Sequence, residues 1–172
     1  MILCCQFLRN LAYNRVGGKH PTGWKDPPLK PAASFWRIVN GNFIDACVLE
    51  WCKLMGDAKG EHCWERVVSD KAKFKAELLQ HLNVSKVEFQ KFRQEMREYR
   101  DKFIAHLDLE LVMNIPKLDL ARKSVEFYHA YVVANETQPA DLSGWPDTAV
   151  KLQGAYREAE EEAELVYKQI FA

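Results

Sequence analysis

Helix-breaking residues are scarce in this chain, with 8 glycines and 7 prolines among 172 residues. Nearly half of them lie in one segment, GGKHPTGWKDPPLKP, at residues 17–31, where their density predicts a loop. The rest of the chain is almost free of residues that interrupt helices. It also lacks the alternation of apolar and polar residues that is typical of strands. The sequence therefore predicts an all-α protein.

An excess of charge of either sign is absent, since Lys and Arg together number 24 and so do Asp and Glu. This balance argues against a histone-like nucleic-acid binder and against an acidic, disordered tail protein. Hydrophobic residues make up 48% of the chain, enough to form a core and to exclude global disorder. Basic residues exceed acidic ones over 66–102, and acidic residues exceed basic ones over 136–172. These segments are either ordinary solvated helix faces or, around 86–102, a positive face that attracts phosphate.

A long hydrophobic run is also lacking. The apolar N-terminal segment MILCCQFLRNLAY is shorter than the span of about 20 residues that a membrane helix needs. It has no basic region before it, so we expect neither a signal peptide nor a membrane anchor. The 5 cysteines form no CxxC pair and no evident disulfide framework, which favours a reducing cytoplasm. Two interpretations apply to Cys47, Cys52, His62 and Cys63, a zinc site or buried thiols. Their spacing favours buried thiols.

Apolar residues recur at helical intervals through most of the chain. The pattern predicts helices over 2–12, 34–55, 69–82, 86–106, 116–132 and 146–171, the last of them acidic. The helix over 34–55 is apolar around much of its circumference, so we expect it to be central. Ser85 and Glu88 have the spacing of a capping box, in which each side chain bonds to the other's backbone N–H. We expect a single domain over residues 1–172, an antiparallel bundle of four or five main helices.

Most of the short motifs that identify catalytic sites are missing, including GxGxxG, the P-loop, HExxH and GxSxG. One segment at the end of an amphipathic helix combines groups useful in catalysis: EYRDKFIAHLD at residues 98–108. On a regular helix Arg100 and His106 lie about 120° apart. They converge only if the helix end distorts, or if a second copy of the chain supplies one of them. Alternatively, the histidine caps the helix and Arg100 forms a surface ion pair.

Arg100 and Asp101, followed by four residues and His106, resemble the R-φ-x(3–5)-H motif of the HEPN superfamily, in which φ is a polar residue. The longer string YRDKFIAHLD is similar to the branch of that superfamily associated with abortive-infection phage defence. The strings DACVLEWCKLMGD and HCWERV and the proline-led helix from residue 116 resemble the same branch. The resemblance covers residues 34–135.

The resemblance implies a helical bundle that forms a homodimer and acts as a metal-independent, toxin-like endoribonuclease. In such enzymes the ribose 2′-OH attacks the adjacent phosphate, leaving a 2′,3′-cyclic phosphate and a 5′-OH. His106 would be the acid/base, since imidazole has a pKa near 6.5, and Arg100 would bind the scissile phosphate. Asp101, where the motif more often has Asn, would orient His106 or Arg100, and we expect Arg97 and Lys102 to bind substrate.

The same resemblance allows a second interpretation, a non-catalytic HEPN module. Such a module would bind a nucleotide, RNA or a partner protein such as an antitoxin. Neither interpretation involves a metal or another cofactor, and neither places the protein at a membrane.

Overall fold

The computed structural model describes residues 1–20, 31–105, 114–138 and 142–171, and within these ranges it contains helices and no strand. The all-α prediction is confirmed. Five helices have 14 or more residues, in agreement with a bundle of four or five main helices. The elements in chain order are α1 (Ile2–Gly17), α2 (Pro31–Trp51), η1 (Cys52–Gly56, a π-helix), α3 (Trp64–Val67), α4 (Lys71–Leu82), α5 (Lys86–Tyr99), η2 (Arg100–Ala105, also a π-helix), α6 (Leu118–Asn135) and α7 (Ala149–Phe171).

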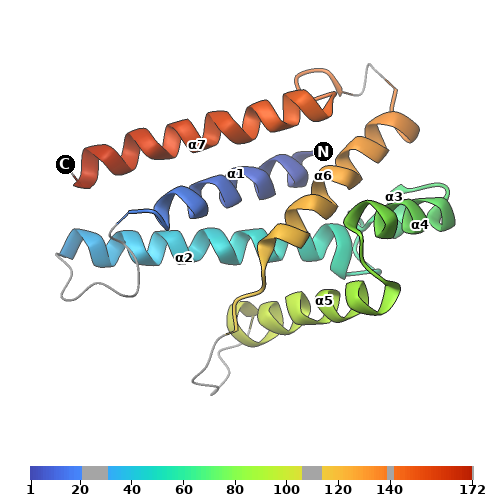
Figure 1. Ribbon diagram of the computed structural model, residues 1–172, viewed down its shortest axis with the longest axis horizontal. Helices are drawn as coiled ribbons and strands as arrows, with labels where there is room; N and C mark the ends of the chain where they lie inside the picture. Colours follow the sequence, from blue (N-terminus) through green and yellow to red (C-terminus); the bar gives the residue numbers. More distant parts are fainter. Residues whose placement is uncertain (21–30, 106–113, 139–141, 172) are drawn as a thin grey trace.

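Helix α1 lies between α2 and α7 in a layer of three helices (Figure 1). It runs antiparallel to α2, and its buried residues cover about half of its circumference. They are Cys4, Phe7, Leu8, Leu11, Ala12 and Val16. Helix α2, expected to be central, contacts η2 and α5 as well as α1. Near the start of α2, Phe35 and Ile38 are 59% and 62% exposed.

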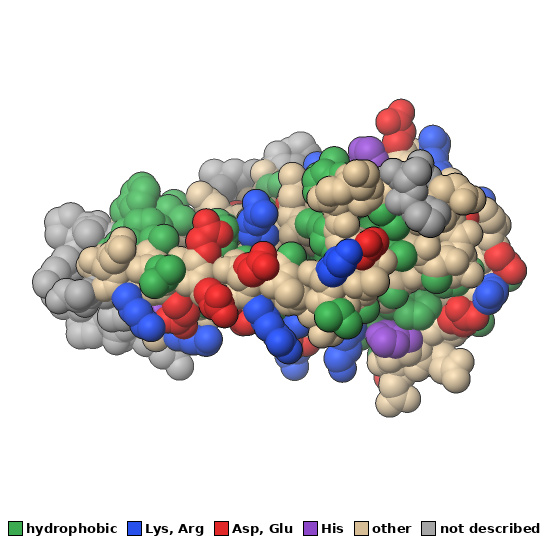
Figure 2. Space-filling view, turned by 90° about the horizontal axis from the view of Figure 1, so that it is seen from above, with side chains coloured by type: hydrophobic (Ala, Val, Ile, Leu, Met, Phe, Trp, Pro, Cys, Tyr) green, Lys and Arg blue, Asp and Glu red, His purple; other side chains and the backbone are tan. Residues whose placement is uncertain are grey.

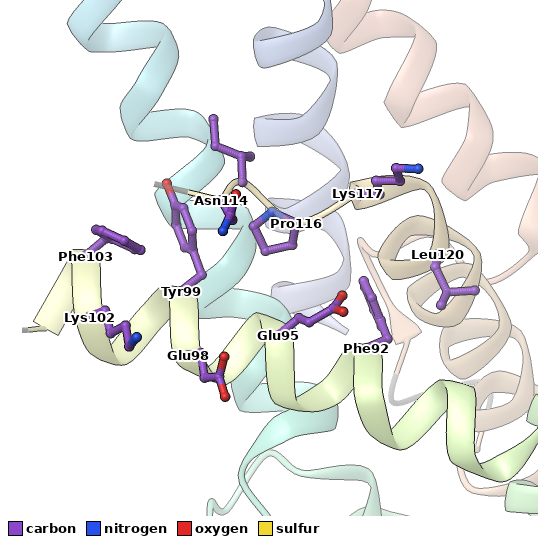
Figure 3. A pocket seen from close by; sticks show the side chains of 11 residues that line it. Phe92, Glu95, Glu98, Tyr99, Lys102, Phe103, Asn114, Pro116, Lys117 and Leu120 are labelled. Carbon is purple, nitrogen blue, oxygen red and sulfur yellow. The ribbon is translucent and has the colours of Figure 1, made fainter. Parts of the chain in front are cut away.

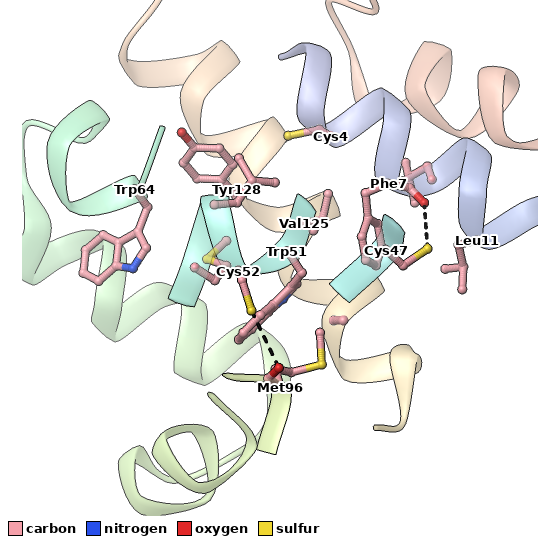
Figure 4. Close-up of a cluster of buried hydrophobic side chains, with 14 of the residues drawn as sticks. Cys4, Phe7, Leu11, Cys47, Trp51, Cys52, Trp64, Met96, Val125 and Tyr128 are labelled. Carbon is pink, nitrogen blue, oxygen red and sulfur yellow. Dashed lines mark hydrogen bonds between the residues drawn. The ribbon is translucent and has the colours of Figure 1, made fainter. Parts of the chain in front are cut away.

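Trp51, near the end of α2, is the largest fully buried side chain of the core (Figure 4). Its ring meets that of Phe92 from α5 edge-on, with 5.2 Å between the ring centroids. Its indole Nε1 donates a hydrogen bond of 2.8 Å to Ser124 Oγ on α6, and Ser124 in turn donates to the carbonyl of Ala121. Trp51 thus joins α2, α5 and α6 through one apolar and one polar contact.

Local sequence signals predicted some helix ends more accurately than others. The capping box is confirmed: Ser85 N donates to Glu88 Oε2 at 2.7 Å and Glu88 N donates to Ser85 Oγ at 3.2 Å. The cap of α4 is Asp70 rather than Ser69, because the Asp70 carboxylate accepts from the backbone N–H of Lys73.

Three other predicted boundaries were wrong by a few residues. Helix α1 continues to Gly17, past the predicted end at residue 12, whereas α6 and α7 begin two and three residues after Pro116 and Pro146. The predicted loop at 17–31 falls mostly on residues 21–30, which lie outside the described residues.

The surface formed by α7 carries charges of both signs. Figure 2 looks onto this helix and shows acidic and basic side chains interspersed along it. Val166 on this helix is 39% exposed. Within the described ranges, no helix is both long enough and apolar enough to cross a membrane.

Replacing Ser124 with Ala tests the polar contact that fixes Trp51. The variant keeps the packing volume nearly unchanged but leaves the buried indole N–H without an acceptor, so we expect a loss of about 1–3 kcal/mol in the free energy of unfolding. Urea denaturation followed by tryptophan fluorescence measures it. Ser143→Ala, at an exposed site, is the control and should be neutral; equal stability of the two variants would contradict the role of Ser124.

Glu50 is a half-buried carboxylate on α2 that faces α1. Asn10 Nδ2 donates to its two carboxylate oxygens at 3.1 and 3.2 Å. Burial raises the pKa of Glu50 from 4.5 to about 7, although the bond from Asn10 and the charge of Lys53 oppose the shift. At a pH between 4.5 and about 7, Glu50 has lost its proton in the unfolded chain but keeps it in the folded chain. The contribution of Glu50 to the free energy of unfolding therefore falls as the pH rises from 4.5 to 7.

Glu50→Gln should remove this pH dependence. We expect the variant to gain stability relative to the wild type as the pH rises from 4.5 to 7, with no further change above pH 7. Chemical denaturation at several pH values checks this, with the exposed Glu61→Gln as the control. A difference between variant and wild type that does not vary with pH would show that Glu50 ionises alike in both states.

Candidate functional site

The segment that resembles the HEPN motif begins where α5 gives way to the π-helix η2 at Arg100. Short π-helical turns inserted in α-helices are frequent at functional sites. The sequence allowed Arg100 and His106 to converge through a distorted helix end or through a second copy of the chain. The structure shows that the helix end is π-helical. His106 itself lies outside the described residues, so its position relative to Arg100 stays a prediction.

Two carboxylates hold the guanidinium of Arg100. Nη1 bonds to Asp57 Oδ2 at 2.5 Å and Nε bonds to Asp101 Oδ1 at 2.8 Å, while the side chain is 17% exposed. The bond to Asp101 is the main reason that the pKa of Arg100 is raised, and the bond to Asp57 adds to it against the effect of burial. The direction of the Arg100 guanidinium is therefore fixed, and its Nη2 makes no hydrogen bond to the described residues.

Asp101 had two predicted roles, orienting either His106 or Arg100. The structure shows the second, because its Oδ1 accepts the Nε–H of Arg100. The Asp101 side chain is 53% exposed, so the carboxylate also adds negative charge to the open side of the site.

Asp57 was missed by the sequence reasoning. It follows Gly56, the last residue of η1, and both belong to the string DACVLEWCKLMGD. The signal available in the sequence was a carboxylate placed directly after a glycine that ends a helix. Its pairing with Arg100, 43 residues later in the chain, depends on how η1 packs against α5.

The turn at Gly56 rests against a row of arginines on α5 and η2. Arg93 donates to the Gly56 carbonyl from Nη2 at 3.0 Å and from Nε at 3.3 Å. A Cβ at Gly56 would lie 3.3 Å from Cys52 Cβ and 3.6 Å from Arg97 Cγ, so the backbone and α5 approach closely here. Any larger residue at 56 would push against both elements.

Arg93, Arg97 and Arg100 share one helix face, because their spacings of four and three residues bring side chains into one row. Arg93 pairs with Glu65 at 3.5 Å, and Arg100 is held as described above. Arg97 is exposed and forms no ion pair with a described residue. The predicted substrate-binding residue Arg97 thus lies beside Arg100 with its charge uncompensated.

Lys102, the other predicted substrate-binding residue, lines a separate groove between the end of α5 and residues 114–117 (Figure 3). This groove has a volume of about 620 Å³. Tyr99 and Phe103 form part of its wall, and Glu95 and Glu98 balance the charges of Lys102 and Lys117. The hydroxyl of Tyr99 donates to Asp45 Oδ1 at 2.8 Å, and its pKa is raised mainly by burial. The structure therefore separates Lys102 from the face that carries Arg97 and Arg100.

All five cysteines are free thiols, of which Cys4, Cys47, Cys52 and Cys63 are buried and Cys5 is partly exposed. Cys47 Sγ lies 3.5 Å from the carbonyl of Phe7, and Cys52 Sγ lies 3.8 Å from the carbonyl of Met96 (Figure 4). Burial raises the pKa of Cys52 to about 12, which keeps the thiol protonated. In the described part of the chain no three His, Cys, Asp or Glu side chains gather as metal ligands.

Comparison of the chain with family models, with curated proteins and with solved structures finds no match.

The two carboxylates that hold Arg100 should differ in their effect on stability. The Asp57 side chain is 35% exposed, and its bond to Arg100 joins two elements distant in sequence. Asp101 follows Arg100 directly in the chain, and its side chain is more exposed, at 53%. We expect Asp57→Ala to cost about 1–2 kcal/mol and Asp101→Ala less than about 0.5 kcal/mol.

Thermal unfolding should show this as a lower Tm for Asp57→Ala, by about 2–4 °C for each kcal/mol. Asp101→Ala is the matched control, because it removes the other carboxylate of the same guanidinium. An equal or larger loss in that variant would mean that the contact between η1 and η2 does not depend on Asp57.

Proposed function

We propose that this chain is a HEPN-like, metal-independent endoribonuclease. The observation that carries the proposal is the guanidinium of Arg100, held in place by Asp57 and Asp101 with Nη2 unused, at the π-helical start of the motif that continues to His106. A fork held in place needs little reorganisation when it binds a phosphate, which is the property that transition-state stabilisation requires.

In the proposed reaction the ribose 2′-oxygen attacks the adjacent phosphorus and the bond from phosphorus to the 5′-oxygen breaks. The products are a 2′,3′-cyclic phosphate and a 5′-OH. His106 accepts the 2′-OH proton, and an imidazolium supplies the proton that the leaving 5′-oxygen needs. Arg100 Nη2 donates to a non-bridging phosphate oxygen, on which negative charge grows in the transition state. No step requires a metal ion.

A homodimer is part of the proposal. The apolar face of α5 is buried in the core of its own chain, where Tyr99 is 3% exposed and Phe103 is partly buried, so the two copies would meet through the surface around the motif. An isologous contact needs only one patch on each copy. Two copies would bring two Arg100/His106 pairs to one cleft. One imidazole would then act as the base while the other acts as the acid.

A second candidate function follows from the charge around Arg100. Asp57 and Asp101 together neutralise its guanidinium and place carboxylates beside the phosphate that it would bind. That feature favours a non-catalytic module, which would bind a nucleotide, RNA or a partner protein such as an antitoxin.

The cleavage assay separates the two functions. We expect the wild-type protein to be a dimer by light scattering and to cleave single-stranded RNA in the presence of EDTA, with a 2′,3′-cyclic phosphate detected by mass spectrometry. His106→Ala and Arg100→Ala should each slow cleavage by about 100-fold or more while remaining folded dimers. Arg157→Ala, at an exposed site on α7, should leave the rate unchanged.

Three results would count against this proposal in different ways. Absence of EDTA-resistant cleavage on varied RNAs would favour the non-catalytic module. Equal cleavage by His106→Ala would show that the site is wrongly assigned. A monomeric wild-type protein would remove the composite cleft.

A further inference from the structure

A second groove, with a volume of about 390 Å³, lies between α4 and α5. Its rim carries four cationic side chains, and the single carboxylate that lines it, that of Glu65, pairs with one of them. The apolar lining includes Trp64 and Phe89, which are 7% and 8% exposed. The four cationic residues are Lys71, Lys75, Lys86 and Arg93.

The three lysines of this rim are exposed, and none forms an ion pair with a described residue. Two carboxylates adjacent in the sequence are engaged elsewhere. Asp70 accepts from the backbone N–H of Lys73, and Glu88 accepts from that of Ser85. The lining of the groove therefore holds four cations and one carboxylate, while Asp70 and Glu88 keep their negative charge outside the lining.

This groove shares one residue with the arginine row that leads along α5 to the candidate site. Arg93 belongs to both the groove and the arginine row, which leads through Arg97 to Arg100. From Lys86 to Arg100 the helix advances about 21 Å, at about 1.5 Å per residue. A stacked nucleic-acid strand carries one phosphate per about 3.4 Å, so the row matches about six phosphates.

We infer that the groove between α4 and α5 binds the phosphodiester backbone of single-stranded RNA outside the point of cleavage. The inference rests on the proposed function for its choice of RNA. A line of separate cations matches a polymer with one charge per nucleotide, and the apolar floor strengthens each contact by excluding water. The exposed amide of Gln90 also lines the groove, but contacts to phosphates carry no sequence information, so the binding that the cations supply is independent of sequence.

The test measures binding without cleavage. A fluorescein-labelled 12-nucleotide oligo(U) in which every ribose is 2′-O-methyl cannot undergo attack by its 2′-oxygen. Anisotropy titrations over a range of salt concentrations compare the wild type with the triple variant Lys71→Gln, Lys75→Gln, Lys86→Gln. We expect the variant to bind about tenfold more weakly or worse, and the slope of log K against log salt to decrease by about 2, since each lost phosphate contact removes about 0.7.

The matched control neutralises three exposed lysines that do not line the groove, Lys91→Gln, Lys123→Gln and Lys168→Gln. It should retain the wild-type Kd and slope. Equal weakening in the control would show that net charge alone decides binding. A wild-type slope retained by the groove variant, or competition by polyglutamate as strong as that by RNA, would overturn the inference.

The assay also separates this inference from the proposed function. Weakened binding by the groove variant in a protein that never cleaves RNA would refute the nuclease and leave the groove. Cleavage by the wild type together with unchanged binding by the groove variant would refute the groove and leave the nuclease.

Discussion

The contact between η1 and the arginine face of α5 determines where the candidate groups of this protein lie. The carbonyl of Gly56 accepts two bonds from Arg93, and the thiol of Cys52 approaches the carbonyl of Met96. Because the chain is so close to α5 at this point, the next residue, Asp57, reaches Arg100. The contact is thus both a packing constraint and the origin of the clamp on the candidate phosphate-binding group.

The clamp also divides the cationic groups of α5 into two kinds. Two carboxylates hold the guanidinium of Arg100 in one orientation and balance its charge, so Arg100 is an oriented hydrogen-bond donor with little net charge around it. Arg97 and the lysines of the second groove are exposed and, among described residues, unpaired, so they offer attraction without a fixed direction. In a nuclease these properties complement each other, because long-range attraction captures the substrate and a fixed fork stabilises the transition state.

Sequence periodicity predicted the helices because the repeat of apolar side chains can be recognised within each segment, and the Ser85–Glu88 capping box is local in the same sense. It did not reveal that α1 would lie between α2 and α7, because that arrangement depends on contacts between segments distant in the chain. Arg100 and Asp101 were identified from a local motif. Asp57 was not, since its role exists only after two segments 43 residues apart have packed together.

The aspartate at position 101 has a physical explanation in this arrangement. An asparagine there would accept the Nε–H of Arg100 through its amide oxygen, but without charge. The carboxylate makes a stronger, charge-assisted bond and holds the fork more firmly. Its cost is repulsion of the phosphate, which increases as salt is lowered. Arg97, exposed on the same face and without an ion pair to a described residue, opposes that repulsion. Under the proposed function, attraction of RNA to this site would therefore depend on the cations around Arg100 more than on Arg100 itself.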